Sequence, residues 1–334
     1  MEKIEILCDY QENFESESND GYINDHQTKE TFIEIEKAIK LLGYPCEIFG
    51  GVPELLLAQN SKMNLKNRIF LNLSDGLSHQ YSRVQVPILC DILGVKYSGG
   101  NPFTVALTSN KFYTKLAVEK IGVPIAWSIL VTANNLPEDK ILNAIPYPVI
   151  VKPNCEGSSV GIDSLSICYN LKQLNSKISD MLEKYSEIII EKFIAGYDIT
   201  NFIIGNTGNY PLNQTLVALH DNKVIENEAV MSINDYIDLK NSYENALSYI
   251  SNQTNKKILD YSQAIASHLN VYDIARIDYR VTKSGQIYFL EVNTVPAIHK
   301  RTQAGAVCKI LGMSFENFLD IYVTSVVKRL QNMK

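Results

Sequence analysis

Short runs of apolar residues, separated by polar ones, predict where strands and helices lie along this chain. In the first hundred residues the pattern predicts strands at 3–9, 45–49, 68–73 and 95–98, and helices at 31–42 and 84–93. Gly43 and Gly94 directly follow the two helices, where a C-cap glycine is typical. Strands that alternate with helices indicate a parallel α/β domain, whose ligands bind beyond the carboxyl ends of the strands.

The pattern changes after residue 108. It predicts a helix at 108–121 and another at 171–185, and strands at 128–132, 147–152, 160–167 and 187–193. Further short strands are predicted at 198–204, 216–220 and 223–228, a helix at 255–269, and a last amphipathic helix capped by Ser314. Residues 231–252 have no clear periodicity, and a loop of that length is usually a functional lid or disordered.

The candidate chemistry starts with a predicted hairpin, whose strands are 274–281 and 286–293. If Val281 pairs with Gln286, alternation places Arg276, Asp278, Glu291 and Asn293 on one face, and an apolar set on the other: Ile277, Tyr279, Tyr288, Leu290 and Val292. Two carboxylates and an amide oxygen are hard ligands that suit Mg²⁺, and an arginine beside them favours anionic oxygens such as those of phosphate. The alternative is a solvated outer face of an ordinary antiparallel hairpin.

Two upstream segments carry related signals. In VIVKPNCEGSSVG (149–161), a buried strand leads to Lys152 and then to a loop of small residues. Small residues let backbone N–H groups approach phosphate oxygens, and a lysine adds charge, although an ordinary Gly/Ser turn is the alternative. In IIIEKFIAGYDIT (188–200), a strand ends at Glu191 and the chain reverses through Gly196 to Asp198. A carboxylate at a strand end followed by exposed apolar residues can bind an adenosine through amide, apolar and hydroxyl contacts; the alternative is an ordinary strand–turn–strand segment.

Composition narrows the class of protein. A chain of 334 residues is expected to form two or three domains, and 46% hydrophobic with 20% charged residues is typical of globular proteins. The net charge of −6, without a dense basic block, argues against a nucleic-acid partner. No apolar run approaches the ~18 residues that span a bilayer, and no signal peptide is visible. Six scattered cysteines without CxxC spacing are expected to be reduced, so we predict a cytoplasmic enzyme.

In their order and spacing, KPNCEGSSVG, ARIDYRV and FLEVNT resemble the ATP-grasp superfamily and, within it, the D-alanine–D-alanine ligase family. FLNLSDG, LTSNKFYTK, IIIEKFIAGYDIT and LGMSF extend the resemblance from about residue 70 to 315. It implies an N-terminal parallel α/β domain (1–103), followed by a two-lobed ATP-grasp domain (104–186 and 187–334, the latter with the metal site) that clamps ATP.

The resemblance also implies a role for each matched residue. Lys111 and Lys152 would contact the phosphates, and Glu156, Ser158 and Ser159 would form the loop that covers them. Glu191, Phe193 and Ile194 would bind adenine, and Asp198 the ribose. Asp278, Glu291 and Asn293 would hold two Mg²⁺ ions, or Mn²⁺, and Arg276 would steady an acyl phosphate and the later tetrahedral intermediate. Ser158 is also expected to act in catalysis, as is Lys240, which lies with Asp235 and Tyr236 in the substrate-covering loop.

The substrate half of the sequence departs from the family. No glutamate in CDYQENFESESNDG can be matched to the one that receives the first substrate's ammonium, and LSHQYSRVQVP replaces a Gly-rich stretch. We hypothesise that His299, Lys300 and Arg301, with a hydroxyl from Thr302, bind an acidic acceptor or a terminal carboxylate; the alternative is that they face solvent.

We therefore expect an ATP-dependent carboxylate–amine ligase that joins small, amino-acid-like substrates and releases ADP and phosphate. The alternatives are an enzyme that forms an ester or thioester, and a nucleotide-binding protein without ligase activity. The resemblance also leads us to expect a homodimer formed through the N-terminal domain.

Overall fold

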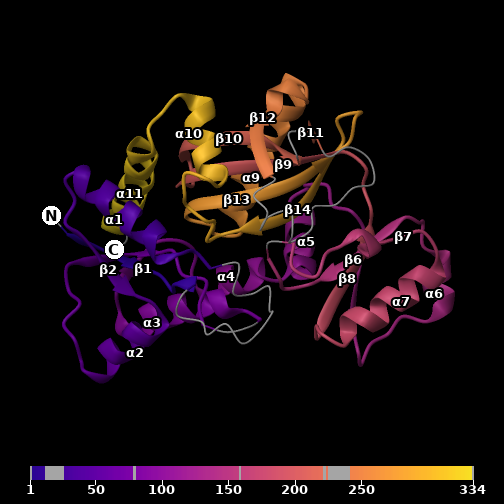
Figure 1. Cartoon of the computed structure of the whole chain (residues 1–334), viewed down its shortest axis with the longest axis horizontal. Coiled ribbons are helices and arrows are strands. Elements are labelled where there is room, and N and C mark those ends of the chain that lie inside the picture. Colours follow the sequence, from indigo (N-terminus) through magenta and orange to yellow (C-terminus); the bar gives the residue numbers. More distant parts are fainter. Residues whose placement is uncertain are drawn as a thin grey trace.

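The computed structural model describes residues 2–11, 26–77, 80–157, 159–220, 223–224 and 241–332. Three sheets are arranged along the molecule, and the third in chain order lies between the other two (Figure 1). The first is parallel, in the order β2-β1-β3-β4: β1 (Lys3–Leu7), β2 (Cys46–Gly50), β3 (Arg68–Asn72) and β4 (Lys96–Tyr97). Helices α1 (Lys29–Leu41), α2 (Val52–Asn60) and α3 (Gln85–Leu93) accompany it. The predicted parallel α/β domain is confirmed; only α2 was not predicted.

The second sheet is antiparallel, in the order β5-β8-β6-β7. It contains β5 (Ser128–Thr132), β6 (Val149–Pro153), β7 (Ile167–Cys168) and β8 (Glu187–Lys192), with helices α6 (Asp139–Ala144) and α7 (Leu171–Leu182). Before it come α4 (Pro102–Thr108), which was not predicted, and α5 (Lys111–Glu119), which corresponds to the helix predicted at 108–121 but begins three residues later. It begins there because the Asn110 side chain accepts a hydrogen bond from the N–H of Tyr113 at 3.0 Å and caps α5.

The predicted strand at 160–167 is wrong. Residues 159–161 form turns, and the 3₁₀ helix η4 (Ser164–Ser166) follows. The Asp163 N–H donates to Ser166 Oγ at 3.0 Å, and that hydroxyl donates back to the Asp163 carboxylate at 3.1 Å, which bends the chain locally. Val160 and Ile162 are apolar because they line a pocket, so their alternation does not reflect a sheet.

The third sheet is antiparallel, in the order β11-β10-β9-β13-β14, and β12 also pairs with β10. Its strands are β9 (Tyr197–Asn206), β10 (Asn209–His220), β11 (Lys223–Val224), β12 (Asn241–Asn245), β13 (Asp273–Val281) and β14 (Ile287–Asn293). The end of the predicted loop at 231–252 is instead β12, the 3₁₀ helix η5 (Ala246–Ser248) and the start of α9 (Asn252–His268). Residues 231–240 lie outside the described part of the chain, as do 225–228 of a predicted strand.

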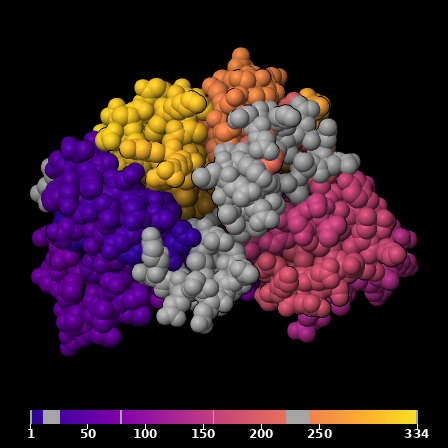
Figure 2. Space-filling model, in the orientation of Figure 1, coloured from indigo at the N-terminus to yellow at the C-terminus, as the bar shows by residue number. Residues whose placement is uncertain are grey.

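The last two helices, α10 (Gln303–Leu311) and α11 (Phe315–Asn332), join the first and third sheets. One hydrophobic core contains Ile6 and Leu71 of the first sheet, Phe202 of the third, and Phe318 of α11, whose ring lies 5.7 Å from that of Phe202. Figure 2 shows these C-terminal helices lying directly against the N-terminal domain. Asn317 donates its N–H to Ser314 Oγ at 3.1 Å, which confirms the predicted cap of α11; α10 was not predicted.

A buried ion pair reinforces this junction. Arg329 of α11 binds both carboxylate oxygens of Asp273, at 2.9 and 2.6 Å, and donates to the Tyr97 carbonyl at 2.9 Å. The N–H of Gly99 binds the same carboxylate at 2.9 Å. Asp273, at the start of β13, is fully buried. The pair therefore connects the N-terminal domain, the third sheet and the last helix.

Two further predictions concern the whole chain. The predicted boundary at 186 separates β8 from the sheet in which it pairs with β5 and β6, and the division into domains stays a prediction. Within the described ranges, no single helix has the length and apolar composition to cross a membrane; α10 and α11 have them only together, with a bend of 109° between them.

Candidate active site

Two adjoining pockets lie among the three sheets. The larger encloses about 1140 Å³ and the smaller about 680 Å³ of empty space. Five residues line both: Lys111, Glu156, Gly157, Arg276 and Glu291. A group that passes from a ligand in one pocket to a ligand in the other would cross this shared wall.

The predicted hairpin forms its floor, with a register that differs from the prediction. Val281 pairs with Ile287 rather than Gln286, and a bulge shifts the register between Asp278 and Tyr279. Because of the bulge, Leu290 faces the pocket beside Glu291, and Tyr288 is only half-buried; placing both on the apolar face was wrong. Ile287 and Phe289 are buried in their stead.

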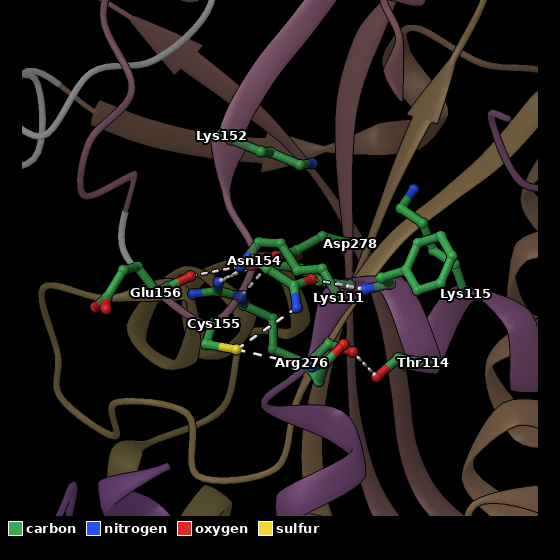
Figure 3. A network of polar contacts seen from close by, with 12 residues as sticks. Lys111, Thr114, Lys115, Lys152, Asn154, Cys155, Glu156, Arg276 and Asp278 are labelled. Carbon is green, nitrogen blue, oxygen red and sulfur yellow. Dashed lines mark hydrogen bonds and ion pairs between the residues drawn. The ribbon is translucent and has the colours of Figure 1, made fainter. Parts of the chain in front are cut away.

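The four polar side chains of the hairpin lie where the prediction places them. Asp278 pairs across the strands with Glu291, and Arg276 with Asn293. Arg276 donates to the Asp278 carboxylate at 3.0 Å and lies 3.6 Å from that of Glu291 (Figure 3). Thr200, opposite Asp278 on β9, donates its hydroxyl to Asp278 at 2.8 Å.

The electrostatics of this floor suit a cation. Burial, together with the Glu291 charge, raises the pKa of the Asp278 carboxyl, against the charge of Arg276. Burial also acts to raise the pKa of Glu291, but the charges of Lys111 and Arg276 outweigh it and lower that pKa to about 2. In the described residues no cluster of three His, Cys, Asp or Glu side chains forms a metal site. Two adjacent carboxylates and the Asn293 amide oxygen nevertheless fit a Mg²⁺ ion that keeps several water ligands.

Lys111 enters the shared wall from the first turn of α5. Its ammonium lies 3.0 Å from the Glu291 carboxylate and donates to the Glu156 carbonyl. Asn154 holds the helix in place, because its carbonyl and its side-chain oxygen accept the N–H groups of Lys111 and Phe112, at 3.0 and 2.9 Å. The loop after β6 and the start of α5 thus form one unit (Figure 3).

A buried ion triad joins β6, β8 and α5. Glu191 on β8 pairs with Lys152 on β6, and with Lys115 on α5 at 2.9 Å. Burial lowers the pKa of the Lys115 ammonium, although the Glu191 charge opposes this. Burial acts to raise the pKa of Glu191, but the two lysines outweigh it and lower that pKa to about 2. Lys115 was not predicted, although it follows Lys111 by one helical turn in NKFYTK.

The predicted nucleoside residues line the far end of the larger pocket. Phe193, Ile194 and Asp198 are all in its wall, and a second unpredicted cation, Arg280, contacts all three. Arg280 pairs with the Asp198 carboxylate, donates Nε–H to the Ile194 carbonyl at 2.9 Å, and lies 5.6 Å from the centre of the Phe193 ring. Its place in the sequence ARIDYRV, two residues beyond Asp278, was the available signal.

The structure describes only part of the two segments that are predicted to cover the phosphates and the substrate. Glu156 and Ser159 line the larger pocket, and Ser159 has a left-handed backbone with φ of +59°. Ser158 and Lys240, both predicted to be catalytic, lie outside the described residues, as do Asp235 and Tyr236. Beyond them in the chain, Tyr243 of β12 accepts a hydrogen bond from Gln303 at 2.7 Å, and both line the same pocket, which sequence reasoning missed.

The structure does not bring residues 299–302 to either pocket. His299 lies 3.8 Å from Glu34 of α1, and Lys300 lies over the Phe315 ring at 5.8 Å. Arg301 is exposed, and the Thr302 hydroxyl donates to the carbonyls of Ala297 and His299, at 3.0 and 2.8 Å. Burial lowers the pKa of His299, against the charge of Glu34. These side chains shape the turn before α10.

The N-terminal domain supplies the outer wall of the smaller pocket. Asp75, three residues beyond β3, accepts a hydrogen bond from Arg83 Nε at 2.6 Å, and Tyr81 and His26 line the same pocket. The Tyr81 hydroxyl accepts from Asn110 at 2.8 Å. Cys155, from the loop after β6, completes this side of the pocket. The wall lies at the carboxyl end of a parallel strand, as predicted for ligands of this domain.

The chain has a parallel α/β domain followed by two antiparallel lobes. Lysines, an arginine and a carboxylate face surround the wall that the two pockets share. This combination defines an ATP-grasp enzyme. Comparison with known proteins supports this class. The family model "D-ala D-ala ligase C-terminus" matches residues 117–324. The D-alanine–D-alanine ligase of Aquifex aeolicus is 30% identical over 241 residues, which are 71% of this chain and 75% of that one. That of Borreliella afzelii is 27% identical, over 73% and 68% of the two chains.

Solved structures agree on the fold. The Bacillus anthracis D-alanine–D-alanine ligase complexed with ATP covers 100% of both chains with a TM-score of 0.74 at 20% identity. The VanG D-Ala:D-Ser ligase of Enterococcus faecalis covers 98% and 100% with a TM-score of 0.68 at 16% identity. The chain belongs to the D-alanine–D-alanine ligase family. It is an ATP-grasp ligase, an enzyme that forms amide bonds with release of ADP.

Proposed function

We propose that the protein joins two amino acids through an acyl-phosphate intermediate, with ATP in the larger pocket and the amino acids in the smaller one. The observation that carries this proposal is the wall the pockets share, where Lys111, Arg276 and Glu291 converge. A substrate carboxylate in the smaller pocket would meet the γ-phosphate at this wall, where the two cations Lys111 and Arg276 can neutralise the charge of both groups.

The reaction then has two steps. A carboxylate oxygen of the first amino acid attacks the γ-phosphorus, the bond to the β–γ bridging oxygen breaks, and ADP leaves. The amine of the second amino acid attacks the carbonyl carbon, loses a proton, and expels phosphate. Lys111 and Lys152 supply positive charge along the phosphates, and Arg276 steadies the acyl phosphate formed in the first step and the oxyanion of the tetrahedral intermediate in the second.

A metal face is part of this proposal. Asp278, Glu291 and Asn293 would hold two Mg²⁺ ions, which supply neutralisation of phosphate charge when bound. Thr200 fixes the Asp278 carboxylate by its 2.8 Å hydrogen bond, so one oxygen of that group keeps a defined direction. Glu291, with its lowered pKa, is ionised at neutral pH and ready to act as a ligand.

The outer wall of the smaller pocket supports amino acids as substrates. An amino acid carries an ammonium and a carboxylate, and Asp75 with Arg83 presents the complementary pair of charges. We place the ammonium of one substrate at Asp75. Asp75→Asn should then raise the Michaelis constant of that amino acid at least about tenfold, the worth of a hydrogen bond between charged groups, and leave ATP affinity unchanged. An equal loss of affinity for the amino acid and for ATP would contradict this placement.

The decisive experiment is mass spectrometry of products formed from pooled D- and L-amino acids with ATP and Mg²⁺. We expect a dipeptide mass with stoichiometric ADP, and single-substrate reactions then identify the two partners and their stereochemistry. Formation of an ester or thioester would replace the amide assignment. ADP release at the same slow rate with and without amino acids would overturn the ligase proposal.

A further inference from the structure

Arg280 is a buried guanidinium that the reaction above does not use. It is 5% exposed, stands on β13 two residues from Asp278, and is the cross-strand partner of Asp198 on β9. Alternate residues of β13 face the larger pocket, so Arg276, Asp278 and Arg280 form one row: Arg276 and Asp278 at the phosphate end, and Arg280 at the nucleoside end.

Two elements of the nucleoside end, β9 and the segment after β8, meet at this one side chain. Its ion pair with Asp198 reaches β9, its 2.9 Å hydrogen bond to the Ile194 carbonyl reaches the segment after β8, and its guanidinium lies over the Phe193 ring. Asp198, Ile194 and Phe193 are three of the four positions that the family resemblance assigns to adenine and ribose; the fourth is Glu191. A planar, permanently charged group with donors in a fixed fork suits such a role better than a lysine would.

We propose that Arg280 is a positioning residue for nucleoside recognition, which holds the Asp198 carboxylate and the 193–194 segment in their binding arrangement. This inference rests on the proposed placement of ATP in the larger pocket. Arg280 touches neither the phosphates nor the reacting carbonyl in this arrangement. It acts by orienting Asp198, whose oxygens accept hydrogen bonds from the ribose hydroxyls, and by fixing the backbone that borders the adenine.

The physical basis is pre-organisation. Asp198 has a partly exposed side chain at the start of β9, and without Arg280 it would sample several rotamers. Held by a buried cation, it offers the ribose one orientation, so binding does not have to order it. The same cation ties the Ile194 carbonyl to β13, so the backbone beside the adenine and the carboxylate for the ribose are set by one group.

The test measures binding of ATP, 2′-deoxy-ATP and 3′-deoxy-ATP by calorimetry, without any amino-acid substrate. In Arg280→Met we expect ATP to bind about tenfold more weakly. The preference for ATP, measured as the ratio of the dissociation constants of a deoxy analogue and of ATP, should fall towards one for at least one of the two analogues. Asp198→Asn should lose the same preference. The double variant should bind ATP no more weakly than whichever single variant has the lower affinity. Arg280→Lys should lie between Arg280→Met and the wild type.

Arg329→Met is the matched control. It removes an arginine from another carboxylate at β13, the buried Asp273, and neither residue lines the larger or the smaller pocket. It should lower thermal stability and leave the ATP preference intact. Wild-type affinity and preference in folded Arg280→Met, or tighter ATP binding, would overturn the inference; tighter binding would mean that Arg280 competes with ribose for Asp198. Failure of the wild type to bind ATP would instead overturn the proposed function.

Discussion

The buried carboxylate Glu191 allows a quantitative prediction about stability. In the folded protein its pKa falls from an ordinary 4.5 to about 2, because two lysine charges outweigh the effect of burial. Such a fall corresponds to about 3 kcal/mol of folding free energy at neutral pH. Replacing it by glutamine also leaves Lys115 and Lys152 buried side by side, and losing one partner of a buried ion pair typically costs about 3–5 kcal/mol. We expect Glu191→Gln to lower the unfolding free energy of its lobe by about 3 kcal/mol.

The assay is built into the chain. Its single tryptophan, Trp127, packs in the core of the same lobe, and its carbonyl accepts the N–H of Lys192, next to Glu191, at 3.1 Å. Tryptophan fluorescence therefore reports unfolding of this lobe in urea. With an m-value of about 1.5–2 kcal/mol per molar for so small a unit, the midpoint should fall by about 1.5–2 M at pH 7.

The pH dependence has a definite direction. A carboxyl whose pKa is lower in the folded state contributes its full stabilisation above about pH 4.5, and loses it as the pH falls from 4.5 towards 2. The difference between wild type and variant should hence be constant from pH 7 down to about 5 and narrow only below that. The control is Glu187→Gln on the same strand, where the 2.8 Å bond from Asn154 survives the change and the loss should stay within about 1 kcal/mol. Equal midpoints at pH 7, or narrowing above pH 5.5, would refute the reasoning.

Three further outcomes are expected. Asp278→Asn should lower Mg²⁺-dependent ADP release about 10²–10³-fold in a coupled assay without lowering the melting temperature, because it removes a carboxylate beside Glu291; EDTA should abolish release in the wild type. Retained activity would remove Asp278 from the metal face. Arg329→Met should lower the melting temperature by several degrees, because it leaves the buried Asp273 carboxylate without its ion-pair partner. An unchanged melting temperature would contradict the stabilising role of this ion pair at the junction. If the predicted homodimer forms through α2 and α3, which expose Leu57 and Ile92, Ile92→Asp should convert dimer to monomer in light scattering, whereas a wild-type monomer would refute the dimer.

Local patterning was sufficient to predict most of the fold. The four strands of the first sheet and most later elements lie within a few residues of their predicted ranges, because each presents an apolar face with the period of its own structure. The failures share a cause. Val160 and Ile162 are apolar because they border a pocket, and the buried residues of α10 pack on β9, β10 and β12, which are distant from it in the sequence. Patterns within a segment do not reveal what it packs against.

The candidate site shows the same limit at finer scale. The family motifs led to Asp278, Glu291 and Lys111, which the structure brings together. Lys115 and Arg280 stand in the same motifs, yet their partners, Glu191 and Asp198, are about 80 residues away, so only the tertiary fold reveals the pairing. For residues 299–302 the charges alone favoured an anion site, whereas local turn hydrogen bonds and contacts with α1 and α11 direct those side chains elsewhere.

The junction made by α11 also bears on how the protein is made. One face of the first sheet, including Ile6 and Leu71, is covered by residues such as Phe318 and Val326, which are synthesised about 250 residues later. A ribosome-bound chain of which only the first hundred residues have emerged would therefore expose this apolar face of the first sheet to solvent. Native packing of the N-terminal domain has to wait for the end of the chain, which makes this protein dependent on post-translational closure and sensitive to truncation at its last helix.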